Sequence, residues 1–340
     1  MLRGSWRPPD AARLVAFSPG LAWVAVLGAE GHVELLDPFA GDTRSLRLDH
    51  PALALALADD GATLAAVDAQ RRVHIVPLAA AAEARVLPVD CGELIRQRVG
   101  PAPVTERVSI APHDVVLAAG TDAVLVSERI VDDEEEYYGG GWITSHARTT
   151  LVHWRTGAGR VLRTDDASNA ITYTVRDAER SADHPVAAAF SSDGLRLGIL
   201  LRTGRLVLYD REGGPLASIA EPALRAFEFL PGDTGLVTAS GARVVTRDLA
   251  GRPRREFSAT HDLTALACSP CGSRIACLDI VGGITVLDAV RGGPMEVIPP
   301  ALAGSPRSIA WLEERLRIRC ADDTLLELRA GEDRSSTTTS

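Results

Sequence analysis

The chain has 340 residues, 46% of them apolar, a net charge of −9 and a pI near 5.4. This length allows one large domain or two ordinary ones. An acidic chain is a poor candidate for nucleic-acid binding, because phosphate contacts need a surplus of Lys and Arg.

The composition is biased in a second way. No lysine is present, all 36 basic residues are arginine, and Asn169 is the sole asparagine. This bias indicates a GC-rich, bacterial genome. The N-terminal MLRGSWRPPD lacks the apolar stretch of a signal peptide, and no apolar run is long enough to span a bilayer. The odd number of cysteines, five, favours reduced thiols in the cytoplasm. We therefore expect a cytoplasmic protein without a membrane partner.

Two sequence markers repeat along the chain with one period. The first is an apolar run that ends in a tight turn at glycine, and the second is an alternating run that closes on aspartate. The glycines are Gly20, Gly61, Gly194, Gly232 and Gly272, and the aspartates are Asp37, Asp210, Asp248 and Asp288. Three glycine steps are 41, 38 and 40 residues, and the last two aspartate steps are 38 and 40. Two markers that keep one phase indicate a true repeat.

Each unit consists of short alternating runs separated by Gly, Pro, Asp and Ser, which is typical of half-buried strands and tight turns. Units of this length with four short strands predict the blades of an all-β propeller. The predicted blades are 11–50, 51–90, 104–164, 184–221, 222–260, 261–301 and 305–329. The last unit supplies only three strands, so we expect the segment 2–6 to provide its outer strand and close the ring.

The repeat resembles that of WD40 proteins, in which strand c ends in Trp-Asp and the turn between strands a and b is often Pro-Asp-Gly. The corresponding pairs are Leu36-Asp37, Trp154-Arg155, Tyr209-Asp210 and Leu287-Asp288, and the turns include Asp59-Asp60-Gly61 and Ser192-Asp193-Gly194. The family's Gly-His pair survives only as His50, His184 and His261. The resemblance thus implies a seven-bladed propeller whose Ser–His–Asp–Trp hydrogen-bond network is incomplete.

The third unit departs from the period, because 81 residues separate His113 from Gly194 where one unit needs about 40. The excess lies at 129–148 and 165–183. We interpret the first segment as a hairpin between the run that begins at Val115 and the run 149–154. An insertion in a regular repeat is a place where function is often added.

The first excess segment combines consecutive carboxylates with aromatic side chains. These residues are Asp132, Asp133, Glu134, Glu135, Glu136, Tyr137, Tyr138 and Trp142. Exposed aromatic residues beside charge are typical of protein interfaces, so the segment is the candidate partner-binding site. Two alternatives stay open: a solvated acidic loop, and a calcium site, although consecutive carboxylates lack the alternating spacing of known calcium loops.

Catalytic and cofactor motifs are missing from the sequence. Cys268 and Cys271 have CxxC spacing, but no second pair accompanies them, and together with Cys277 they are interpreted as small buried thiols. No nucleophile elbow, phosphate loop or dinucleotide fingerprint occurs. We therefore expect no catalytic residue, no metal and no cofactor.

The sequence favours a non-enzymatic scaffold, monomeric by itself, that binds another protein carrying a basic patch. By analogy with stand-alone bacterial propellers, the partner would be an AAA+ ATPase or a von Willebrand A-type protein of a multi-protein system. Two alternatives remain, a hydrolase or lyase with a metal or polar site in the central channel, and a sensor of a small ligand. Residues 331–340 contain no large apolar side chain and are expected to be a disordered tail.

Overall fold

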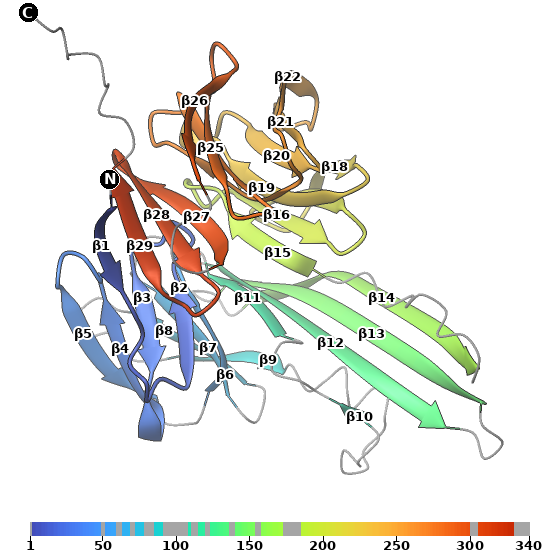
Figure 1. Ribbon diagram of the computed structural model, residues 1–340. Coiled ribbons are helices and arrows are strands. Elements are labelled where there is room, and N and C mark those ends of the chain that lie inside the picture. Colours follow the sequence, from blue (N-terminus) through green and yellow to red (C-terminus); the bar gives the residue numbers. More distant parts are fainter. Residues whose placement is uncertain are drawn as a thin grey trace, which may run out of the picture.

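The computed structural model describes residues 2–48, 52–58, 63–68, 72–77, 85–90, 108–109, 115–119, 123–135, 140–153, 158–172, 185–299 and 305–329. These residues form seven antiparallel sheets arranged as the blades of a β-propeller (Figure 1). The predicted all-β, seven-bladed fold is therefore confirmed. The tail 331–340 lies outside the described residues.

Three blades come from the first half of the chain. Blade 1 contains β2 (Leu14–Phe17), β3 (Val24–Leu27), β4 (His32–Leu36) and β5 (Thr43–Arg47). Blade 2 contains β6 (Ala52–Leu57), β7 (Thr63–Asp68), β8 (Arg72–Pro77) and β9 (Arg85–Asp90). Blade 3 contains β10 (Val108–Ser109), β11 (Val115–Ala119), β12 (Ala123–Glu135), β13 (Gly140–His153) and β14 (Ala158–Thr172).

Four blades come from the second half. Blade 4 contains β15 (Pro185–Phe190), β16 (Arg196–Leu201), β17 (Arg205–Asp210) and β18 (Pro215–Ala220). Blade 5 contains β19 (Leu224–Phe229), β20 (Leu236–Ser240), β21 (Arg243–Arg247) and β22 (Pro253–Ser258). Blade 6 contains β23 (Leu263–Cys268), β24 (Arg274–Asp279), β25 (Ile284–Asp288) and β26 (Pro294–Ile298). Blade 7 contains β27 (Pro306–Leu312), β28 (Arg315–Cys320), β29 (Leu325–Arg329) and β1 (Leu2–Trp6).

The hydrophobic core lies between neighbouring blades. One cluster joins Leu35 of blade 1 to Leu64 of blade 2, and another joins Ala276 of blade 6 to Ile318 of blade 7. Because each blade is covered on both faces, its second and third strands carry nearly continuous apolar runs, as in β16 and β17. The first strands of blades 1 to 4 contact one another in order, as do those of blades 5 to 7, and these strands surround the axis. Burial of apolar area at every seam is what keeps the ring together.

The aspartates of the second sequence marker hold the turns between the third and fourth strands. Asp37 accepts hydrogen bonds from the backbone N–H groups of Phe39 and Ala40. Asp248 accepts them from Ala250 and Arg252. A short carboxylate that bonds the backbone two residues ahead stabilises a turn. The repeated aspartate is thus explained by turn formation.

A buried serine holds the turn between the first and second strands in three blades. The hydroxyl of Ser18 accepts hydrogen bonds from the N–H groups of Ala22 and Trp23, both at 3.1 Å. The hydroxyls of Ser191 and Ser269 accept the corresponding bond from the residue that opens the second strand. These serines keep the buried end of the turn free of unpaired N–H groups.

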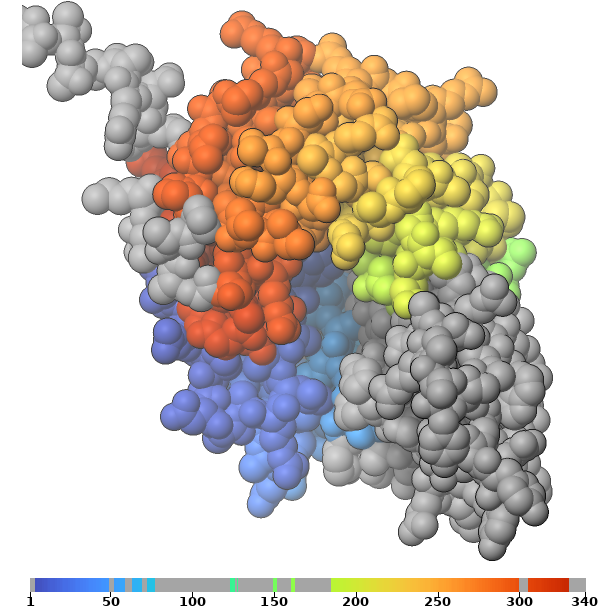
Figure 2. All heavy atoms as spheres, turned by 45° about the vertical axis from the view of Figure 1, so that its right-hand side comes forward, coloured from blue at the N-terminus to red at the C-terminus, as the bar shows by residue number. Residues whose placement is uncertain are grey.

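The N-terminal strand closes the ring as predicted. β1 pairs antiparallel with β29, so blade 7 gains its fourth strand from the opposite end of the chain (Figure 1). Trp6 of β1 also packs edge-to-face against Phe17 of blade 1, with 6.4 Å between ring centroids. The atoms of the first and last parts of the chain meet along this seam (Figure 2).

A buried arginine crosses the same seam. Arg317 of β28 is 1% exposed, and its Nη1 donates to the carbonyl oxygens of Leu21 and Ala22 in blade 1 at 2.8 and 3.2 Å. Its Nε donates to Oε2 of Glu327 at 3.1 Å, and its guanidinium carbon lies 4.8 Å from the ring centroid of Phe39. One side chain therefore joins blade 7 to blade 1 through hydrogen bonds and a cation–π contact.

Part of the hydrogen-bond network expected from the WD40 resemblance is present. In blade 6, Nδ1 of His261 lies 3.2 Å from Oδ2 of Asp279, whose Oδ1 accepts from the N–H groups of Val281 and Gly283. In blade 2, the equivalent Asp68 is buried and bonds His74 and Arg72. His50 and His184 lie outside the described residues. Within the described ranges, no helix is both long and apolar enough to cross a membrane.

Candidate functional site

Three strands of blade 3 are longer than every strand of the other blades. β12, β13 and β14 contain 13, 14 and 15 residues, whereas the other blades use described strands of four to seven. They run outward together beyond the neighbouring blades (Figure 1). We call this part of blade 3, residues 129–135, 140–148 and 163–172, the blade 3 extension.

The two excess segments of the third unit are adjacent in space. β12 and β13 pair from Ala123↔His153 to Glu135↔Gly141, and β13 continues to pair with β14 from His153↔Ala158 to Gly140↔Thr172. The described residues of these two segments therefore belong to one three-stranded sheet. A three-stranded ribbon satisfies the backbone of its central strand on both sides, which a lone loop cannot do.

One detail of the sequence interpretation is wrong. The sequence predicts that the run beginning at Val115 enters the hairpin, but Val115–Ala119 is the separate strand β11, and the hairpin starts from Ala123 on β12. The chain reverses direction between Ala119 and Ala123, because β11 and β12 are antiparallel. The alternating apolar pattern, which both runs share, gives no sign of this reversal. The hairpin of the extension is therefore the connection between β12 and β13, the strands b and c of the blade.

Five of the eight predicted partner-binding residues are described, and they lie at the end of this extension. In the backbone ladder, Asp132 lies opposite Thr144, Asp133 opposite Ile143, and Glu134 opposite Trp142. Glu135 is the last described residue of β12 and lies opposite Gly141. Glu136, Tyr137 and Tyr138 lie outside the described residues. The strand register therefore brings four of the predicted carboxylates and Trp142 to the same end of one sheet.

The first strands of five blades share a second feature, a β-bulge at their second residue. The strand register skips one residue in β6, β15, β19, β23 and β27. The skipped residues are Leu53, Val186, Arg225, Thr264 and Arg307. A bulge redirects a side chain out of the regular strand pattern. Sequence analysis missed this feature, because a bulge leaves no signal in an alternating run.

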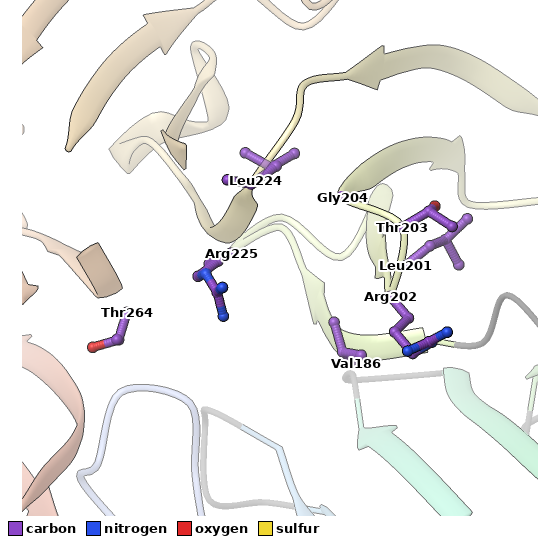
Figure 3. A pocket seen from close by; sticks show the side chains of 9 residues that line it. Val186, Leu201, Arg202, Thr203, Gly204, Leu224, Arg225 and Thr264 are labelled. Carbon is purple, nitrogen blue, oxygen red and sulfur yellow. The ribbon is translucent and has the colours of Figure 1, made fainter. Parts of the chain in front are cut away.

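Three of the bulged residues line one cavity. Val186, Arg225 and Thr264 border it together with the turn Leu201–Gly204 of blade 4, and its volume is about 390 Å³. Arg225 extends into the open space between Thr264 and Val186, whereas the guanidinium of Arg202 is directed away from Arg225 (Figure 3). The cavity is formed by first strands and a b–c turn, so it opens on the face from which the blade 3 extension leaves.

The cysteines of blade 6 do not converge. Cys268 and Cys277 are buried in β23 and β24, and burial raises the pKa of Cys277 to about 12. Cys271 is exposed in the turn between them, so the interpretation of three buried thiols is correct for two and wrong for Cys271. Among the described residues, no three His, Cys, Asp or Glu side chains gather as metal ligands would.

Comparisons with known proteins identify the fold. No protein-family model and no curated protein matches the sequence. The structure is similar to a chain of the crystal structure of the mitotic checkpoint complex, with 16% identity, a TM-score of 0.61, and coverage of 97% of this chain and 92% of that chain. It is also similar to the β-propeller domain of Cps50 (Swd1) from Myceliophteria thermophila, with 12% identity, a TM-score of 0.59, and coverage of 97% and 99%.

Proposed function

We propose that this seven-bladed, WD40-like propeller is a non-enzymatic scaffold that binds another protein through the end of its blade 3 extension. The resemblance predicted from the sequence holds at the level of fold, and a fold by itself leaves the binding site unassigned. The site must therefore be argued from what distinguishes this chain from a regular propeller.

The observation that carries the proposal is the blade 3 extension itself. It prolongs a paired sheet well past the length that a blade needs, and its ladder is complete to Glu135↔Gly141. Ordering the 7, 9 and 10 residues by which the extension lengthens β12, β13 and β14 costs conformational entropy that the blade core does not recover. A paired ribbon that extends away from the ring suits a surface meant for contact.

The composition of the end of the extension supports a protein partner with the opposite charge. Five carboxylates stand in sequence from Asp132 to Glu136, followed by Tyr137, Tyr138 and Trp142. Carboxylates accelerate encounter with a basic patch, and aromatic side chains bury area on docking. The partner classes suggested by analogy with stand-alone bacterial propellers, AAA+ ATPases and von Willebrand A-type proteins of a bacterial cytoplasmic system, are the first to test.

Affinity capture with a matched pair of baits tests this function. The wild-type protein is compared with a variant in which residues 132–142 are replaced by a short Gly-Ser turn that rejoins β12 to β13. We expect a partner that the wild type retains and the variant loses, while both proteins melt at the same temperature. Equal recovery of the same partners by both baits would contradict the proposal.

A further inference from the structure

The bulged positions make the axial opening of the ring locally basic. Arg225 and Arg307 occupy the skipped position in β19 and β27. Arg13 occupies the corresponding place in blade 1, immediately before β2, where its N–H donates to the carbonyl oxygen of Leu27. All three side chains are exposed. Three of the six described positions in this ring are therefore cationic, in a chain whose net charge is −9.

No described carboxylate neutralises these arginines. Within the described ranges, Arg13, Arg225 and Arg307 form no ion pair, and the lining of the cavity contains neither Asp nor Glu. Glu221, at the entrance of blade 5, is already engaged by Arg247. Of the three, Arg225 lines the cavity, and cations without counter-charge in or near a concave site attract anions.

We propose that this opening binds a small polyanion, a ligand bearing phosphate or carboxylate groups, with Arg225 as its principal contact. A guanidinium offers a planar pair of N–H donors that matches the oxygens of both groups. The volume of about 390 Å³ falls within the range of small-molecule sites. Arg13 and Arg307 stand at the equivalent register positions of blades 1 and 7, where they add to the positive potential.

Isothermal titration with two probes tests the proposal and distinguishes phosphate ligands from carboxylate ligands. Inorganic pyrophosphate represents phosphate ligands and citrate represents carboxylate ligands, both titrated at matched ionic strength. We expect saturable binding of at least one probe. Arg225→Gln should weaken it by about tenfold or more, the usual scale for losing a charge-assisted bidentate contact.

A control arginine on the same blade excludes a general charge effect. Arg254 is exposed on the outer strand β22, so Arg254→Gln removes the same charge at a distance from the opening and should leave the affinity unchanged. Both variants should melt like the wild type. Equal loss in the two variants, no loss in Arg225→Gln, or no saturable binding of either probe would overturn the proposal. Binding of an acidic peptide that neither probe displaces would overturn it as well.

Discussion

At the residue scale, the buried Arg317 shows why this ring closes with a charge at its seam. The guanidinium donates hydrogen bonds to acceptors in two blades. These acceptors are the carboxylate of Glu327 in blade 7 and the carbonyl oxygens of Leu21 and Ala22 in blade 1. A charge that is 1% exposed is tolerable only when its hydrogen bonds are made. The stability of variants at Arg317 therefore measures how much the contact between blades 7 and 1 contributes to the fold.

Arg317→Met should lower the free energy of unfolding by about 3–5 kcal/mol, because Glu327 would be left buried with less compensation. Adding Glu327→Leu should restore much of the loss, since an apolar pair needs no counter-charge. Arg243→Gln, which breaks the exposed pair with Glu256, is the control and should change stability little. Urea unfolding measures all of them, and a fully stable Arg317→Met protein would refute this account of the seam.

Cys271 should be the most reactive of the described cysteines. Hydrogen bonds from Ser269 and Ser273 to its sulfur, the latter at 2.9 Å, lower its pKa to about 7. Burial raises the pKa of Cys268 and of Cys277. Because the thiolate is the nucleophile, alkylation of Cys271 should rise with a midpoint near pH 7. The three described buried thiols, Cys268, Cys277 and Cys320, should stay unlabelled until the protein unfolds.

Mass spectrometry that resolves each labelled cysteine measures this profile directly. Ser273→Ala is the matched variant, because it removes one donor to the sulfur, and it should move the midpoint toward the ordinary thiol value. A midpoint for wild-type Cys271 near pH 9 would show that the serines do not stabilise its thiolate.

Sequence patterns predict some of these residues and miss others for clear reasons. The aspartates at strand ends are visible because a turn needs a local carboxylate at a fixed offset, and the structure uses Asp37 and Asp248 in that way. The role of Arg317 at the seam is invisible in the sequence, because its partners in blade 1, Leu21 and Ala22, are about 295 residues away. Its alternation with Leu316 and Ile318 resembles an ordinary strand with one exposed charge.

At the element scale, the N-terminal strand determines whether blade 7 is complete. β1 covers the edge of β29, and an uncovered edge strand presents unpaired N–H and C=O groups. The sequence predicts this closure because the last unit has only three strands and a spare alternating segment stands at the start. Counting strands in each repeat is therefore sufficient to find a ring that closes on itself.

Deletion of residues 1–9 should lower the melting temperature clearly. The variant loses the β1–β29 pairing and the contact between Trp6 and Phe17, and loss of a large aromatic from a packed seam alone costs about 3 kcal/mol. Deletion of residues 331–340, the predicted tail, serves as the control. If both truncated proteins melt like the full-length chain, β1 does not stabilise the ring.

In the third blade, the sequence predicts where extra residues lie but does not predict how the strands pair. The repeat locates the excess residues, because 81 residues occupy the place of about 40. It does not reveal that β13 pairs with both β12 and β14, nor that Val115–Ala119 forms a separate strand. Pairing between segments is a tertiary property that alternation alone leaves open.

At the scale of the whole molecule, two features distinguish this chain from a regular propeller. The blade 3 extension carries the described acidic residues 132–135 and Trp142 away from the ring. The bulges of β19 and β27 place Arg225 and Arg307 near the axis, and Arg13 occupies the corresponding place before β2. The extension and the cavity beside Arg225 both lie on the face of the ring that carries the b–c turns. A protein partner at the extension and a small anion at the axis would occupy separate positions, so each can be tested without the other.

Most of the fold, and little of the site, follows from the sequence. The markers of a blade are repeated along the chain, so a few degenerate units do not hide the number of blades or the missing strand of the last one. The cationic opening is assembled from one residue per blade, with no repeated motif and steps of about 40 residues, as from Arg225 to Thr264 and Arg307. Only the ring geometry shows that these positions are equivalent.

Binding kinetics on a captured partner test the central claim, that the end of the blade 3 extension is the partner site, most directly. Replacing Asp132, Asp133, Glu134, Glu135 and Glu136 by Ser should mainly slow association and flatten its dependence on salt, because the carboxylates steer encounter. Trp142→Ala should mainly accelerate dissociation, by about 1–3 kcal/mol for an anchoring aromatic. Association and dissociation rates equal to those of the wild type in both variants would contradict the claim.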